Sequence, residues 1–99
     1  MGRDGSGSLV IVVLDGDTDV GFRRARRCLA DGHRVAVVSR HPGGAIRVIH
    51  GYRAEQVMVI VADPTEPRQW RRVTDRVVER FGRIDEVVHG ADADLLALA

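Results

Sequence analysis

The sequence predicts an α/β fold: a parallel sheet of about four strands with flanking helices, built in three layers. Short, β-branched and nearly continuous apolar segments alternate along the chain with amphipathic segments of helical period. Strands that are apolar on both sides are typical of parallel sheets, because helices cover both faces of such sheets. The length of 99 residues allows one domain with one core.

The four predicted strands are separated by segments long enough to cross over the sheet. They cover residues 9–14 (LVIVVL), 34–39 (RVAVVS), 56–62 (QVMVIVA) and 84–89 (IDEVVH). Right-handed crossovers place them in the spatial order 3-2-1-4, which is half of a doubly wound sheet. Residues 1–8 (MGRDGSGS) are expected to form a disordered polar tail, so the predicted domain covers residues 9–99.

The segment 20–30 has the pattern of an amphipathic helix that ends at Gly32. Its apolar residues recur at helical spacing, while its arginines face outward. The apolar residues are Phe22, Ala25, Cys28 and Leu29.

A second amphipathic helix is predicted over residues 66–81. We expect Thr65 to cap it, Pro67 to lie in its first turn and Gly82 to end it. Its apolar stripe consists of Trp70, Val73, Val77 and Phe81. Residues 42–55 carry a weaker signal, because Gly43 and Gly44 favour a turn while the apolar residues after them allow a short crossover helix.

The composition excludes several kinds of chemistry. All 15 basic residues are arginines, so a Schiff-base lysine, a P-loop lysine and a lysine that lowers a tyrosine pKa are absent from these residues. The lone Cys28 cannot form an internal disulfide and is expected to be a small buried apolar residue; no metal site is predicted. No apolar run approaches the roughly 18 residues of a membrane span, so we expect a soluble, cytoplasmic protein.

The turn after the first predicted strand is a candidate anion site. It runs Leu14-Asp15-Gly16-Asp17-Thr18-Asp19-Val20-Gly21 and leads into the first helix. Unpaired N–H groups and the helix dipole both favour an anion at such a place.

This turn resembles the first turn of the short-chain dehydrogenase/reductase family, T-G-x-x-x-G-x-G. Aligning the last glycine of the pattern on Gly21 places its threonine on Leu14, its first glycine on Asp15 and its middle glycine on Asp19. Three further segments are similar to family segments in the same order: LADGHRVAVVSR (29–40), ADPT (62–65) and FGRIDEVVHGAD (81–92). The last is similar to F-G-R-I-D-x-L-V-N-N-A-G, with His89 and Gly90 in place of both asparagines.

The resemblance implies a Rossmann-like fold and a dinucleotide site for NADP. Arg40 would hold the 2′-phosphate, and Asp63 would contact adenine. A solvated Arg40 and an Asp63 that only starts a turn are the structural alternatives. The remaining cofactor residues implied are Gly16, Thr18, Asp19, Val20 and Gly21 in the turn and His89, Gly90 and Ala91 after the fourth strand.

The family's reaction is hydride transfer between a nicotinamide and a carbonyl or alcohol. Its catalytic serine and Y-x-x-x-K pair lie beyond the fourth strand, and Tyr52 is followed four places on by Gln56. We therefore assign no catalytic residue and expect these residues to be a truncated cofactor half that is inactive alone.

Asp19 is expected to cap the first helix with its own carboxylate, where a diphosphate would otherwise bind. Asp15 and Asp17 add electrostatic repulsion. Cofactor affinity should therefore be poor.

Other functions fit parts of the sequence. Asp15 and Asp17 after an apolar strand resemble the nucleophile loop of haloacid-dehalogenase-type phosphatases, which bind Mg²⁺, although the downstream lysine is missing. A non-catalytic interaction module is a further alternative: the outer edge of strand 84–89 and Leu95, Leu96 and Leu98 would pair with a partner chain or a second copy. Nucleic-acid binding is disfavoured, because no aromatic residues accompany the arginines.

Overall fold

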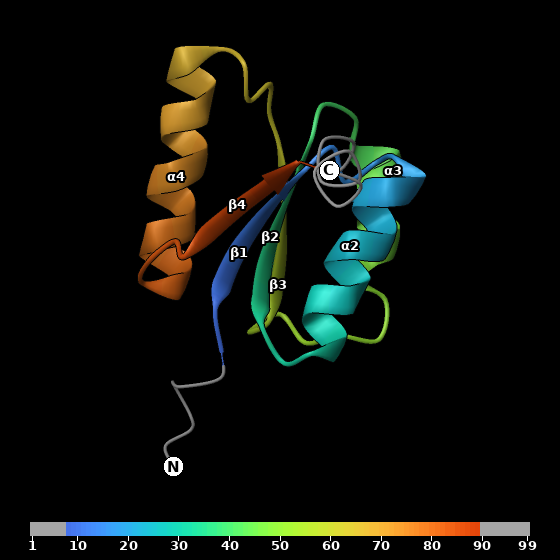
Figure 1. Cartoon of the computed structure of the whole chain (residues 1–99). Helices are drawn as coiled ribbons and strands as arrows, with labels where there is room; N and C mark the ends of the chain where they lie inside the picture. The colour runs from blue at the N-terminus through green and yellow to red at the C-terminus, as the bar shows by residue number, and fades with distance from the viewer. Residues whose placement is uncertain (1–7, 90–99) are drawn as a thin grey trace, which may run out of the picture.

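The computed structural model describes residues 8–89. These residues form a four-stranded parallel sheet in the order β3-β2-β1-β4, which confirms the predicted order. The elements are β1 (Val10–Leu14), α2 (Asp19–Ala30), β2 (Arg34–Ser39), α3 (Pro42–Ile46), the 3₁₀ helix η1 (Arg47–Ile49), β3 (Val57–Val61), α4 (Pro67–Phe81) and β4 (Glu86–His89). Helices α2 and α3 cover one face of the sheet and α4 covers the other (Figure 1). The α/β fold class is thus confirmed.

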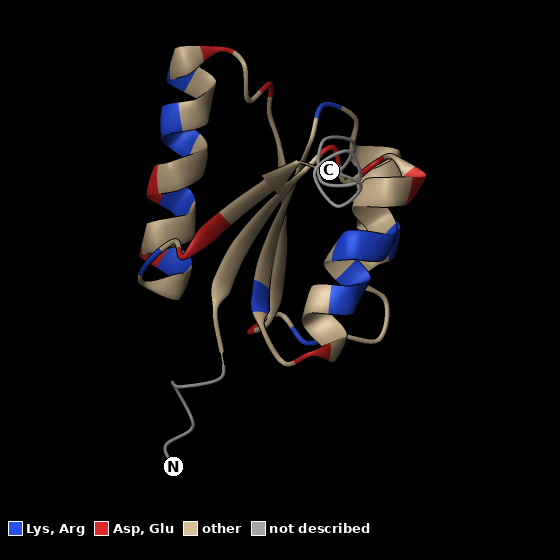
Figure 2. Ribbon diagram, in the orientation of Figure 1, with Lys and Arg blue, Asp and Glu red and all other residues tan. Residues whose placement is uncertain are grey.

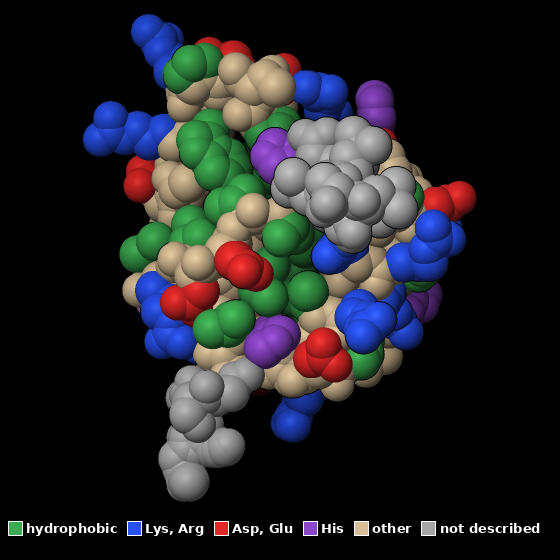
Figure 3. All heavy atoms as spheres, in the orientation of Figure 1, with side chains coloured by type: hydrophobic (Ala, Val, Ile, Leu, Met, Phe, Trp, Pro, Cys, Tyr) green, Lys and Arg blue, Asp and Glu red, His purple; other side chains and the backbone are tan. Residues whose placement is uncertain are grey.

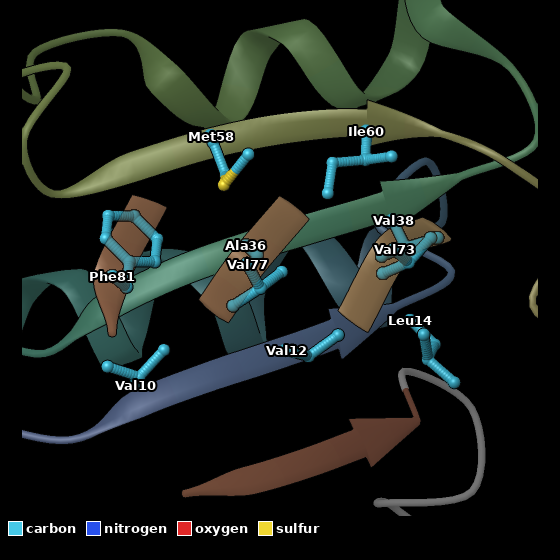
Figure 4. Packing of buried hydrophobic residues seen from close by; sticks show 10 residues of the cluster. All are labelled: Val10, Val12, Leu14, Ala36, Val38, Met58, Ile60, Val73, Val77 and Phe81. Atoms are coloured by element: carbon cyan, nitrogen blue, oxygen red, sulfur yellow. The ribbon is translucent and has the colours of Figure 1, made fainter. Parts of the chain in front are cut away.

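The face of the sheet under α4 carries one of the two hydrophobic clusters. The stripe Val73, Val77 and Phe81 packs on alternate residues of three strands (Figure 4), and Trp70 lies half-buried beside it. The strand residues in this cluster are Val10, Val12, Leu14, Ala36, Val38, Met58 and Ile60. The period-2 alternation of the strands and the helical period of the stripe therefore produce the same interface.

The opposite face packs against α2, α3 and η1. Ala25 and Leu29 of α2 and Ala45 and Val48 of the α3–η1 segment are buried there. Residues 42–49 thus form the short helical crossover that their apolar residues allowed. Cys28 lies against this cluster but is half-buried rather than fully buried, and burial raises the pKa of its thiol.

Helix α4 begins differently from the prediction. Glu66, not Thr65, is the N-cap, and its Oε1 accepts a hydrogen bond from the backbone N–H of Gln69 (3.1 Å). Thr65 is turned away because its hydroxyl and backbone N–H both donate to Asp63 Oδ1 (2.6 and 2.9 Å). Gly82 ends the helix in the left-handed region at φ 93°, as its position predicted.

Asp85 links the start of β4 to the start of β1 by two hydrogen bonds to the backbone of Val10. Its Oδ2 accepts from the backbone N–H of Val10 (2.8 Å), and its own N–H donates to Val10 O (2.8 Å). Its carboxylate also accepts from Arg83 Nε. The hydrogen bonds from Arg83 and Val10 hold the pKa of Asp85 below its ordinary value.

The expected tail, residues 1–8, lies outside the described residues except for Ser8, whose carbonyl oxygen accepts from Arg83 (3.0 Å). None of the helices within residues 8–89 has the length and apolar character of a membrane span. The cytoplasmic location stays a prediction.

Candidate functional site

The carboxyl ends of all four strands lie at one edge of the sheet, since the strands are parallel. In open α/β sheets, ligands bind outside this edge, where the strand order changes direction. Here the change lies between β1 and β4, and the turn Asp15–Thr18 leaves β1 beside it. Two residues that the sequence predicts for the site lie at the same edge. Arg40 directly follows β2, and Asp63 lies two residues after the end of β3.

The turn is held against β2 by Gly16. Its N–H donates to Val38 O (3.2 Å), and a Cβ added at Gly16 would lie 1.9 Å from Val37 Cγ1. A side chain at this place would collide with the core. The turn therefore requires the glycine for close approach, not for an unusual φ.

Asp15 occupies the left-handed region at φ 58° and is the one non-glycine residue with a positive φ among the described residues. This is the position where the family pattern has its first glycine. Backbone in this region costs about 1 kcal/mol for a non-glycine residue, and aspartate is among the residues that tolerate it best. Asp15 thus adopts a backbone conformation that a glycine would adopt more readily.

Thr18, not Asp19, is the N-cap of α2. Its Oγ1 accepts from Gly21 N–H (3.0 Å) and donates to Asp15 O (2.7 Å). The expectation that the Asp19 carboxylate caps the helix is therefore wrong. The left-handed Asp15 turns its carbonyl oxygen toward Thr18, and this bond fixes the Thr18 hydroxyl as the capping group.

The amides of Asp19 and Val20 have no hydrogen-bond partner among residues 8–89. The next two amides are paired: Gly21 N–H donates to Thr18 Oγ1, and Phe22 N–H donates to Thr18 O (2.8 Å). Two donors and the positive end of the α2 dipole therefore remain at the helix start.

The α3–η1 segment packs against this turn, which the sequence analysis did not predict. Arg47 pairs with Asp19 Oδ1 (3.2 Å), and its guanidinium carbon lies 4.1 Å from the centre of the Phe22 ring. A Cβ at Gly44 would lie 3.0 Å from Asp17 Cβ, so Gly44 lets α3 approach the turn. The Gly43-Gly44 pair is the one local signal for this approach, and by itself it indicates a turn rather than a contact with Asp17.

Arg40 and Asp63, which the resemblance assigned to two parts of one cofactor, form an ion pair. Arg40 Nη2 lies 3.1 Å from Asp63 Oδ1, and the two side chains are 52% and 38% exposed. The hydrogen bonds from Thr65, and after them the one from Arg40, hold the pKa of Asp63 below its ordinary value. Asp63 thus starts the Asp-Pro-Thr turn; its contact with adenine stays a prediction.

His89 ends β4 next to Leu14 of β1, at the same edge of the sheet. Gly90 and Ala91, together with Leu95, Leu96 and Leu98, lie outside the described residues. Within residues 8–89, no group of three histidine, cysteine or acidic side chains is placed to hold a metal ion.

A comparison with protein families matches residues 9–95 to the short chain dehydrogenase model. The chain belongs to the short-chain dehydrogenase family. No protein in a search of curated proteins matches it.

Solved short-chain dehydrogenases share the fold. A putative 3-oxoacyl-reductase from Bacillus thuringiensis is 20% identical, with a TM-score of 0.75 over 83% of this chain and 35% of that chain. A short-chain type dehydrogenase/reductase from Mycobacterium marinum is 25% identical, with a TM-score of 0.72 over 80% and 33%. A 3-ketoacyl-(acyl-carrier-protein) reductase from Brucella melitensis, complexed with NADH, is 22% identical, with a TM-score of 0.74 over 80% and 32%. The chain spans about a third of the length of these proteins.

Proposed function

We propose that this short-chain dehydrogenase chain forms the first half of a nicotinamide-dinucleotide site and prefers NADP. The observation that carries the proposal is the β1–α2 turn, where Gly16 and Gly21 allow close backbone approach and two amides at the start of α2 have no hydrogen-bond partner within residues 8–89. Family membership favours this function over a phosphatase centred on Asp15 and Asp17.

The residues fit the two charged groups of such a cofactor, its diphosphate and its 2′-phosphate. The amides of Asp19 and Val20 would face the diphosphate, and Arg40, after β2, would hold the 2′-phosphate by a charge-assisted fork. The Arg40–Asp63 pair is exposed, so giving it up for a phosphate costs little. Asp15, Asp17 and the Arg47-paired Asp19 lie around the same turn, and their carboxylates lower the affinity for an anion.

In a whole family protein the cofactor would accept or donate a hydride with a carbonyl or alcohol substrate. The 99 residues contain no lysine, and we assign none of them a catalytic role. In this proposal they bind and orient the dinucleotide and do not transfer hydride by themselves.

Replacing Arg40 with glutamine is expected to weaken NADP⁺ binding by about tenfold and to leave NAD⁺ binding unchanged, because only NADP⁺ carries the 2′-phosphate. Calorimetric titration of the chain with each dinucleotide measures both affinities. Arg53→Gln is the matched control, since Arg53 is an exposed arginine whose side chain pairs, among the described residues, with Glu55 alone at 3.9 Å. An equal loss in both variants, or tighter binding of NAD⁺ than of NADP⁺ by the unaltered chain, would contradict the NADP preference.

A second proposal, supported by the β4 side of the sheet, is that this side binds a partner chain or a second copy. Asp85 N–H donates to Val10 O. Because successive residues of a strand direct their backbone N–H and C=O groups to opposite sides, those of Glu86 and Val88 face away from β1. Val78 and Val87 are 46% and 39% exposed, and hydrophobic side chains gather on the face that α4 and β4 share (Figure 3). Within residues 8–89 no strand pairs with this edge, and an unpaired edge beside an apolar surface favours association.

Light scattering is expected to show an oligomer of the 99-residue chain that Val87→Arg shifts toward monomer, because a charge on an edge strand opposes pairing. Val61→Arg, on the other edge strand, is the matched control and should leave the oligomer intact. A monomer at every concentration would refute association between copies.

A further inference from the structure

An arginine-lined pocket of about 420 Å³ lies between the outer edge strand β3 and helix α4. Its strand side consists of Ile60, Val61 and Ala62, and its helix side carries Arg68, Arg72 and Arg76. We call these six residues the arginine groove. None of them belongs to the candidate dinucleotide site.

The three arginines stand in one row on α4, each four residues after the last, and basic residues mark α4 along its length (Figure 2). No carboxylate within residues 8–89 pairs with any of them. In contrast, Arg26 donates to the carbonyl oxygens of Val48 and His50, and Arg47 pairs with Asp19. Among residues 8–89, the row of arginines on α4 therefore contributes no ion pair to the fold.

One acidic side chain, Glu66, also lines the pocket. Its carboxylate already accepts from Gln69 N–H as the cap of α4. Because three arginines line the pocket against this one carboxylate, its net charge is positive.

The edge of β3 beside this row has unpaired backbone groups. Gln56 O accepts from Val35 N–H (2.8 Å) and Ala62 N–H donates to Ser39 O (3.0 Å), so the even-numbered residues face β2. By the alternation of a strand, Val59 and Val61 direct their N–H and C=O groups outward. Within the described residues these groups have no partner, whereas Val57 N–H donates to Arg53 O (3.3 Å).

The two features match in spacing. Four residues of α-helix rise about 6 Å, and two residues of extended strand rise about 6.6 Å. Carboxylates at alternate positions of a strand added beside β3 would therefore meet the three arginines in register. We propose that the arginine groove binds an extended acidic peptide, which pairs with the edge of β3 and places alternate carboxylates against Arg68, Arg72 and Arg76.

A single-stranded nucleic acid is the competing polyanion. It binds proteins through aromatic platforms that stack its bases, and no aromatic residue lines this pocket. The unpaired N–H and C=O groups of Val59 and Val61 also suit a peptide backbone, which carries both donors and acceptors.

Fluorescence anisotropy with a labelled peptide TETETET tests the proposal on the 99-residue chain. Arg72→Gln is expected to weaken binding about three- to fivefold, and the triple change of Arg68, Arg72 and Arg76 to glutamine at least about twentyfold. The isomer TTEEETT has the same charge but places its carboxylates on both sides of a strand, so it should bind at least about threefold more weakly. Equal binding of the two isomers would overturn the proposal in favour of unspecific charge attraction.

Arg71→Gln is the matched control, because Arg71 is exposed on the same helix but does not line the pocket. It should leave peptide affinity unchanged, and a loss equal to that of Arg72→Gln would refute the groove as the site. Two N-methylated peptides test the pairing with the edge of β3. One carries methyl groups on the odd-numbered amides and the other on the even-numbered amides, and only the set that faces β3 should abolish binding. Equal effects of the two sets would refute strand pairing. A single-stranded oligothymidine that binds more tightly than TETETET would replace the peptide with nucleic acid as the ligand.

Discussion

Replacing Gly21 with alanine is expected to destabilise the fold by about 3 kcal/mol or more, or to prevent folding. The new Cβ would lie 2.1 Å from the carbonyl oxygen and 2.8 Å from the carbonyl carbon of Asp15. These are backbone atoms, and the Asp15 oxygen is held by the N–H (3.1 Å) and the hydroxyl (2.7 Å) of Thr18. Helix α2 would have to move away from β1, and a domain of this size has only about 5–15 kcal/mol of net stability.

Urea unfolding followed by circular dichroism measures this loss. Gly43→Ala is the matched control: Gly43 lies in α3, a Cβ there meets nothing within 4 Å, and its φ is not positive. It should unfold at the same urea concentration as the unaltered chain or at a slightly higher one, because alanine favours a helix more than glycine does. If Gly21→Ala unfolds like Gly43→Ala, the close contact between α2 and the turn is not a constraint on folding.

The sheet could be predicted from the sequence because the first three strands are mostly apolar on both faces and each long helix is apolar on one, while the fourth strand, β4, is short and mostly exposed. The predicted strand 34–39 matches β2 residue for residue, while the other three strands are one or two residues shorter at their ends than predicted. Strand order followed from crossover handedness, which requires no knowledge of particular contacts.

The details of the site could not be predicted in the same way. Thr18 and Asp19 are both good N-caps, and the choice between them depends on the left-handed Asp15, whose carbonyl fixes the Thr18 hydroxyl. The pairs Arg47–Asp19 and Arg40–Asp63 join residues 28 and 23 positions apart, so no local pattern indicates them. A family resemblance assigned Arg40 and Asp63 to a ligand and so did not suggest that they contact each other.

The position of the β1–α2 turn is set by packing on β2, and a double-mutant cycle is expected to show it. Gly16→Ala should cost about 1–3 kcal/mol, because its Cβ would lie 1.9 Å from Cγ1 of the fully buried Val37. Val37→Ala alone should cost about 2–3 kcal/mol for the lost methyl groups and the cavity they leave.

Together the two changes should cost less than their sum by about 1–2 kcal/mol, since the methyl group at Gly16 then fills the space that Val37 Cγ1 leaves. The free energies of unfolding of the four proteins in urea give this coupling energy. Val37→Ala combined with Gly43→Ala is the control pair and should be additive, because nothing lies within 4 Å of a Cβ at Gly43. Additive costs for Gly16→Ala and Val37→Ala would mean that the turn relieves the collision by moving away from β2. In that case the amides of Asp19 and Val20 would not be held at a fixed distance from the sheet, and the candidate diphosphate site would lose the rigid support that the proposal assumes.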